Sequence, residues 1–489
     1  MSKTFPFILS IFIFLQNSIS SKITAQTKKN TSKERVEEKI IQVENNLVPW
    51  VKNQDNSKYS INERMAKYNV NGLCIAVIKN YQIEWVKAYG WANVQKKEPV
   101  TSKTLFQAGS ISKSLNGVGV LKLAQKKKLD MYTDINDYLL SWKFPYDSVS
   151  KNKKITIANL LSHTAGLSGH GYSGYKKGQE IPSVYNILDG TKPANSEAVR
   201  SISEPGKISE YSGGAITISQ LIVTDITKKK YEDYMLNSVL KPLGMTQSFF
   251  DQPIPNGKLQ LAASGYLADG IEMVEDSFYI YPEKAAAGLW TNSTDLAKYI
   301  IETQLSLKGE SNKVLSQELT KTRLTPYIDP ESGFGVFIKQ KGDEKYFTHN
   351  GGTRGFISEY IGSLENGNGV VIMTNSGNPG ISSEIINSVG IVYDWKDFYN
   401  PSIKKTITLS NTEMQKYIGE YNWYGSPVSI IMKQNDLWFD GPVKSKLYFT
   451  SDLDFYIEEK EMNYKFIKDK NDLVDGFTDT RNVKVQKIK

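Results

Sequence analysis

Phe106-Gln107-Ala108-Gly109-Ser110-Ile111-Ser112-Lys113 is the stretch on which the expected fold depends, because a serine and a lysine stand three residues apart before an apolar run. Residues three apart on a helix share a face, so the lysine ammonium can lie against the serine hydroxyl. A hydroxyl is a weak nucleophile until a neighbouring base accepts its proton. A lysine can be that base when burial or positive neighbours lower its pKa. Ser110 and Lys113 are therefore the candidate nucleophile and base.

The spacing alone is weak support in a lysine-rich chain, because five other pairs share it: Ser148/Lys151, Ser150/Lys153, Ser173/Lys176, Ser238/Lys241 and Ser402/Lys405. Ser110 differs from them because Leu115, Val118 and Leu121 follow it with the spacing of a buried helix face. A helix that begins at Ser110 directs backbone N–H groups and the positive end of its dipole toward an oxyanion. The alternative is a helix-capping serine beside a solvated lysine.

Two further segments favour the catalytic interpretation. Tyr211-Ser212-Gly213 precedes an apolar helical run from Ile216 to Ile226, and His349-Asn350-Gly351 lies between two strand-like runs. In order and spacing, the three segments resemble the Ser-x-x-Lys, Tyr-x-Asn and Lys-Thr-Gly (or His-x-Gly) motifs of the class C β-lactamase and penicillin-binding-protein superfamily. Segments 160–167, 242–245 and 288–296 are also similar to family sequences, and the resemblance covers roughly residues 60 to 390.

The resemblance implies a role for each of these residues. Ser110 would be the acylated nucleophile, and Lys113 would accept its proton or tune its basicity. Tyr211 would carry a proton to the leaving group and could activate the deacylating water. The backbone N–H groups of Ser110 and Gly352 would form the oxyanion hole, in which one donor is typically worth about 10²–10³ in turnover. The other substrate-binding positions that the resemblance implies are His349, Asn350 and Gly351.

The sequence departs from the β-lactamase pattern at two positions. Gly213 stands where Tyr-x-Asn has its Asn, and glycine has no side chain to hydrogen-bond a substrate carboxamide. His349 replaces the Lys of Lys-Thr-Gly, and a histidine is mostly neutral near pH 7, so it attracts a substrate carboxylate less strongly. His-x-Gly variants resemble D-amino-acid-directed peptidases and esterases of the superfamily more than dedicated β-lactamases. We therefore expect a poor β-lactamase, and expect Asn at 213 together with Lys at 349 to improve it.

The predicted function is that of an exported serine hydrolase acting through an acyl-enzyme. Its substrate would be a small molecule or peptide, namely an amide or ester of peptide size or smaller, with D-amino-acid-containing compounds as one candidate class. The alternatives within the enzyme class are a β-lactamase and a carboxylesterase, and an envelope binding protein that kept the fold is the alternative outside it. The sequence does not decide between hydrolysis and transfer, and it leaves the oligomeric state open.

Composition argues against several other classes of protein. The 3 His and 1 Cys are scattered without metal-ligand spacing, so we expect no metal and no cofactor. The formal net charge is +8, but the basic runs lack interleaved aromatic residues or a nucleic-acid motif. We therefore expect no nucleic-acid partner.

The N-terminus predicts export. Lys3 precedes an apolar run from Phe5 to Leu15, and polar and small residues follow to Ala25, as in a signal peptide. The run is shorter than the helix of about 20 residues that crosses a bilayer. We expect residues 1–25 to be a signal peptide, the protein to be periplasmic or secreted, and no stable membrane anchor to remain after cleavage.

The expected fold class is α+β, with a β-lactamase/transpeptidase-like antiparallel sheet over residues 26–400. A hairpin is predicted at 73–89, and strand-like runs return only at 334–374, so one sheet would be built from both groups. Helices would flank this sheet, and the stretch between the two groups would be a helical insertion. Residues 168–200, rich in Gly, Pro and Tyr, read as a long loop over the site.

A small C-terminal all-β barrel-like domain is predicted at 405–489. It resembles the lipocalin-like domain attached to many family members, and it would bind a ligand or polymer or cap the catalytic domain, of which we favour the cap. Turn residues separate its short alternating runs. These runs are 419–423, 428–432, 437–439, 446–450, 455–457, 464–467 and 483–488.

Overall fold

The computed structural model describes residues 33–52, 57–151, 153–423, 426–440, 444–458, 462–479 and 484–488. The predicted signal peptide, residues 1–25, lies outside these residues and stays a prediction. Within the described residues, no helix combines the length and apolar character needed to cross a membrane.

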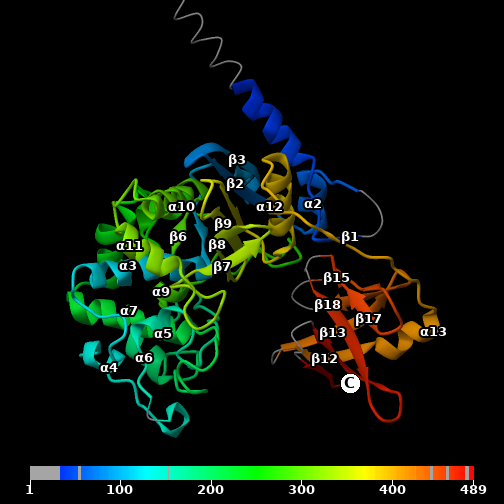
Figure 1. Cartoon of the computed structure of the whole chain (residues 1–489). Coiled ribbons are helices and arrows are strands. Elements are labelled where there is room, and N and C mark those ends of the chain that lie inside the picture. Colours follow the sequence, from blue (N-terminus) through cyan, green and yellow to red (C-terminus); the bar gives the residue numbers. More distant parts are fainter. Residues whose placement is uncertain are drawn as a thin grey trace, which may run out of the picture.

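A seven-stranded antiparallel sheet is the centre of the larger part of the chain (Figure 1). The central strand is β10, and one of its two neighbours is β2, which comes from the opposite end of this part of the chain. In this pair, Cys74 of β2 lies opposite Met373 of β10. The prediction of one sheet built from both strand groups is therefore confirmed. In spatial order the strands are β4 (Glu98–Pro99), β3 (Gln82–Asn93), β2 (Gly72–Lys79), β10 (Gly369–Thr374), β9 (Phe356–Ser363), β8 (Glu344–Thr353) and β7 (Phe337–Lys341).

Helices cover both faces of the sheet. Side chains alternate across a strand, so Leu73 and Ile75 of β2 enter one core while Cys74 and Ala76 enter the other. The first core is closed by helix 33–44, α2 (Ile61–Lys67) and α12 (Gly380–Val392). The second is closed by α10 (Ser293–Lys308) and the helical insertion.

The helical insertion lies between the two strand groups, as the sequence predicts. Its two central helices, α3 and α7, are buried along almost their whole length, and their buried residues include polar ones such as Asn116 and Gln220. A short pair of strands, β5 (Phe106–Gln107) and β6 (Trp290–Thr291), leads the chain into this region. The helices are α3 (Ser112–Gln125), α4 (Ile135–Tyr138), α5 (Ile157–Leu161), α6 (Val184–Asp189), α7 (Gly213–Thr227), α8 (Tyr231–Met235), α9 (Lys284–Ala287) and α11 (Gln317–Leu324).

The C-terminal part is a second, nine-stranded antiparallel sheet, drawn in orange and red in Figure 1. Aromatic rings fill its core, and the ring centroids of Phe455 and Phe466 lie 4.6 Å apart. The predicted role of this part as a cap stays a prediction. In spatial order its strands are β15 (Ser445–Lys446), β14 (Asp436–Asp440), β13 (Ser426–Lys433), β12 (Gly419–Trp423), β20 (Lys484–Lys487), β19 (Val474–Asp479), β18 (Asn463–Lys468), β17 (Asp454–Tyr456) and β16 (Tyr448–Phe449).

The predicted runs overlap all of these strands except β19, and the single run 446–450 is divided between β15 and β16. Strand β19 contains Asp475, Gly476 and Asp479, so it lacks the apolar alternation of the others. Pairing with β18 and β20 places it in the sheet. The predicted division at residues 400–405 stays a prediction, although Leu409 and Met414 already enter the aromatic core.

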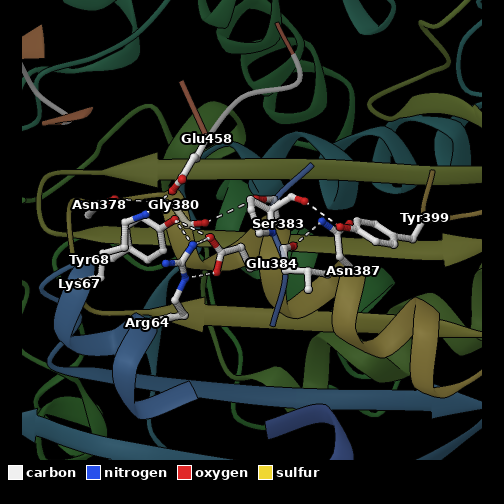
Figure 2. Close-up of polar contacts among 12 residues, drawn as sticks. Arg64, Lys67, Tyr68, Asn378, Gly380, Ser383, Glu384, Asn387, Tyr399 and Glu458 are labelled. Carbon is white, nitrogen blue, oxygen red and sulfur yellow. Dashed lines mark hydrogen bonds and ion pairs between the residues drawn. The ribbon is translucent and has the colours of Figure 1, made fainter. Parts of the chain in front are cut away.

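The helix α2 contacts both parts of the chain (Figure 2). Its Arg64 forms a buried two-bond ion pair with Glu384 of α12, and the Tyr68 hydroxyl donates to the same carboxylate at 2.6 Å. Lys67, one turn further, pairs at 2.7 Å with Glu458 of the C-terminal part. The face of the sheet that α2 covers therefore carries contacts to the C-terminal part.

Candidate active site

Ser110 and Lys113 meet at the start of α3. A single turn, Gly109–Ile111, precedes the helix, so the serine and the lysine lie on one face. Lys113 Nζ donates to Ser110 Oγ at 2.9 Å and to the Ala286 carbonyl of α9 at 2.8 Å. The lysine side chain is buried, and it forms no ion pair with any carboxylate of the described residues. The structure therefore brings together the first two predicted residues.

Tyr211 lies against the same lysine. Lys113 Nζ is 4.9 Å from the centre of the Tyr211 ring. The ring is held by its place just before α7, where the hydroxyl of Ser212 caps the helix by accepting from Ala215 N at 2.9 Å. The ring of His163 lies 4.4 Å from that of Tyr211. The third predicted residue is thus next to the first two.

His349 is buried beside this group. Its Nδ1 donates to the Asn350 carbonyl at 2.6 Å, and its ring lies 6.4 Å from that of Tyr211. Burial, helped by the positive charge of Lys113, lowers the pKa of His349 to about 3. The imidazole is therefore neutral at ordinary pH, as expected of a group that attracts carboxylates weakly.

The backbone of β8 lies directly against the turn that carries Ser110. A Cβ atom on Gly351 would lie 2.0 Å from the Ala108 carbonyl oxygen and 2.8 Å from Ser110 N. A Cβ atom on Gly109 would lie 2.7 Å from Gly352 N, and Gly109 has a φ of +51°. Only glycine fits such close approaches. They place the N–H groups of Ser110 and Gly352 near each other, as an oxyanion hole requires.

These four features form a recognisable arrangement for acyl transfer, with a nucleophile, a buried lysine, a tyrosine and paired backbone donors. The family model described as Beta-lactamase matches residues 60–385. The chain belongs to the Beta-lactamase family. Members of this family and the related penicillin-binding proteins are serine hydrolases.

Individual relatives of this family member agree with the assignment. Protein flp of Staphylococcus aureus is 28% identical over 325 residues, which cover 64% of this chain and 61% of the relative. The match therefore spans only about three fifths of that relative. Penicillin-binding protein 4* of Bacillus subtilis is 21% identical over 425 residues, or 82% of this chain and 90% of the relative.

A solved structure shows the same fold. The crystal structure of D-amino acid amidase from Ochrobactrum anthropi SV3, complexed with L-phenylalanine amide, has a TM-score of 0.55 and 21% identity. It covers 68% of this chain and 96% of the amidase. The antiparallel sheet with a helical insertion is therefore the fold expected from the sequence.

Tyr172 explains one departure from the family motif. A Cβ atom on Gly213 would lie 2.9 Å from Cε2 of the Tyr172 ring and 3.2 Å from the Gly169 carbonyl oxygen. The loop 168–200 therefore occupies the space beside Gly213, and an Asn side chain has no room there. The sequence predicts a long loop at 168–200, which the structure interrupts with the helix α6 (Val184–Asp189). The sequence does not identify Tyr172, because only the fold shows which aromatic side chain of this segment faces α7.

Glu283 is a second residue that sequence reasoning missed. It stands just before α9, three residues from the Ala286 carbonyl that accepts from Lys113. The side chain is fully buried, and neither carboxylate oxygen has a hydrogen-bond partner among the described residues. Burial raises the pKa of Glu283 to about 7. The site thus contains a carboxyl that is partly protonated near neutral pH.

Proposed function

We propose that this protein is an exported serine hydrolase that cleaves a small ester or amide through an acyl-enzyme on Ser110. The observation that carries the proposal is the 2.9 Å contact between Ser110 Oγ and the Nζ of a buried lysine that pairs with no carboxylate in the part of the chain that the structure describes. Among the described residues, the other contacts of the Lys113 ammonium group are the Ala286 carbonyl and the Tyr211 ring. The lysine is therefore placed to assist the attack of the serine hydroxyl.

The chemistry follows from the positions of these groups. Ser110 Oγ attacks the substrate carbonyl carbon, and its proton passes to Lys113 or, through it, to Tyr211 beside it. The N–H groups of Ser110 and Gly352 donate to the oxygen that becomes negative. Tyr211 then protonates the leaving group as its bond to the carbonyl carbon breaks, and the proton taken from Ser110 replaces the one that Tyr211 has given up. A water molecule next attacks the acyl carbon and passes a proton to Lys113, the bond from that carbon to Ser110 Oγ breaks, and Lys113 returns the proton to Oγ.

A D-amino-acid-containing amide or ester is the substrate class that we favour over a β-lactam. Penicillins carry a carboxylate, and His349 is neutral and buried, so it offers little attraction to that charge. The fold shared with a D-amino acid amidase supports amide chemistry on the same scaffold. The apolar segment from Phe5 to Leu15 supports export.

Intact-mass analysis after incubation with a fluorophosphonate tests the proposal. We expect one adduct on the wild type, none on Ser110→Ala, and an unchanged adduct on Ser173→Ala. Ser173 is a matched control, because it is an exposed serine with the same spacing to a lysine, Lys176. An adduct that persists in Ser110→Ala or maps to Ser173 would overturn the proposal. A parallel incubation with a penicillin reports β-lactam recognition, and we expect little or no adduct there.

A further inference from the structure

The segment 168–172 is fixed along the first turn of α7. Gly214 N donates to the Gly169 carbonyl at 2.9 Å, and the Ser212 hydroxyl donates to the Ser168 carbonyl at 2.7 Å. A Cβ atom on Gly214 would lie 2.5 Å from that Ser168 oxygen. The backbone of the loop therefore runs in contact with the helix, and its position is set by several hydrogen bonds.

The Tyr172 side chain is fixed by its own hydroxyl. The Thr217 hydroxyl donates to the Gly213 carbonyl at 3.0 Å, so the Tyr172 hydroxyl, 2.9 Å away, donates to Thr217. Burial raises the pKa of Tyr172 well above its ordinary value, so this donor stays protonated. The hydroxyl of Tyr172 is bound to Thr217, and the atom of Tyr172 that lies nearest to Gly213 is a ring carbon, Cε2.

We propose that Tyr172 determines the acyl specificity of this enzyme by filling, with an apolar ring edge, the place where the motif's Asn side chain would contact substrate. The inference rests on the proposed function and extends it to a substrate class. The acyl group that fits beside this ring is aliphatic or aromatic and has no carboxamide next to the scissile carbonyl. Among D-amino acid derivatives, this favours those with a free amine over N-acylated ones. A carboxamide at the same place would lose its hydrogen bonds to water and gain none from the ring, which disfavours it.

The preference for an apolar acyl group over one with a carboxamide can be measured with two matched esters. The p-nitrophenyl esters of pentanoic acid and of N-acetylglycine have acyl chains of equal length, and only the second carries a carboxamide. For the wild type we expect kcat/KM, corrected for the hydroxide reactivity of each ester, to favour the pentanoate by roughly tenfold or more. The paired change Tyr172→Ala with Gly213→Asn supplies both room and a hydrogen-bonding side chain, and should reduce that ratio by roughly tenfold.

Single variants test whether the two positions act on the same space. Gly213→Asn alone should lose activity, because the Cβ atom of the new side chain would lie only 2.9 Å from Cε2 of the Tyr172 ring. Adding Tyr172→Ala should restore that loss, which makes the two effects strongly non-additive. Tyr172→Phe keeps the ring and should keep the pentanoate preference of the wild type.

The outcomes are decisive even if one variant fails to fold. If Tyr172→Ala with Gly213→Asn is insoluble, Tyr172→Gln and Tyr172→Phe are compared instead, and only the glutamine variant, whose amide can hydrogen-bond a carboxamide, should reduce the ester ratio. A wild-type ratio near one, or folded variants without the ring that all keep the wild-type ratio, would overturn the role of Tyr172. Failure of the proposed function itself looks different, since Ser110 of the wild type would then not react with a fluorophosphonate.

Discussion

Two buried cations lie on opposite faces of the seven-stranded sheet, and their surroundings differ. Arg64, on the face covered by α2 and α12, has both its Nε and a terminal nitrogen on the carboxylate of Glu384 (Figure 2). Lys113, on the face covered by the helical insertion, contacts a hydroxyl, a carbonyl and a ring, but no carboxylate of the described residues. Both side chains are almost completely buried.

The difference separates a structural charge from a reactive one. A buried ion needs a partner, and a bidentate arginine–carboxylate pair is the geometry that best provides it. A buried lysine without such a partner is unfavourable for folding, and proteins keep such features mainly at functional sites. The paired charge should therefore matter for stability, and the unpaired one for chemistry.

Replacing the unpaired cation should have the largest effect on activity. We expect Lys113→Ala to lower kcat/KM for p-nitrophenyl butyrate by at least about 10³-fold, because the Ser110 hydroxyl loses its nearest base. Lys126→Ala is the matched control, since Lys126 is exposed just after the same helix, and should change little. Steady-state kinetics decide the point, and activity of Lys113→Ala within tenfold of the wild type would contradict it.

Breaking the Arg64–Glu384 ion pair should instead have the largest effect on stability. Arg64→Ala leaves Glu384 buried and alone, which typically costs about 3–5 kcal/mol in the free energy of unfolding. Glu331→Ala is the control, because it removes half of an exposed pair with Lys339 and should cost less than about 1 kcal/mol. Denaturant titration measures both, and equal stability losses would remove the distinction between the two kinds of pair.

Glu283 allows a test by pH. Its folded-state pKa of about 7 lies above the ordinary value of 4.5, so its contribution to stability is complete below pH 4.5 and is lost as the pH rises through 7. Relative to Glu283→Gln, the wild type should lose of the order of 3 kcal/mol between about pH 4 and pH 8. Unfolding of both proteins across this range measures the difference. A constant difference between wild type and Glu283→Gln would mean that the carboxyl does not titrate in this range.

His349 should have the smallest pH effect. Because its pKa is lowered to about 3, it stays neutral wherever the enzyme is folded and active. The shape of the kcat/KM profile from about pH 5 to pH 8 should therefore be the same in the wild type and in His349→Gln, even where the absolute rates differ. A step near pH 6.5 that disappears in the variant would show that the imidazole titrates.

The sequence predicts those parts of the molecule that depend on local patterns. The three motifs identify Ser110, Lys113, Tyr211 and the glycines of β8, and alternation of apolar residues identifies most strands. The sequence does not predict the Arg64–Glu384 pair, because these two residues lie 320 positions apart and only the fold brings α2 next to α12. Tyr172 and Glu283 were missed for the same reason, since what matters is which side chain each faces.

One expectation from the sequence changes once the structure is known. The sequence alone suggests that Asn at 213 with Lys at 349 would improve β-lactam turnover. The structure leaves no space beside Gly213 while Tyr172 is present, and it buries His349 almost completely. The Tyr172 ring occupies the place beside Gly213, so Gly213→Asn needs a change at Tyr172 as well.

The central claim is that Lys113 activates Ser110, and the rate of Ser110 phosphonylation tests it most directly. Wild type, Lys113→Ala and Arg64→Ala are each incubated with a fluorophosphonate under conditions where circular dichroism shows them folded, and labelling of the Ser110 peptide is followed by mass spectrometry. The account predicts rates for wild type and Arg64→Ala within about threefold of each other, and a rate for Lys113→Ala lower by at least about 10³-fold. Labelling of Ser110 in Lys113→Ala at the wild-type rate would contradict it.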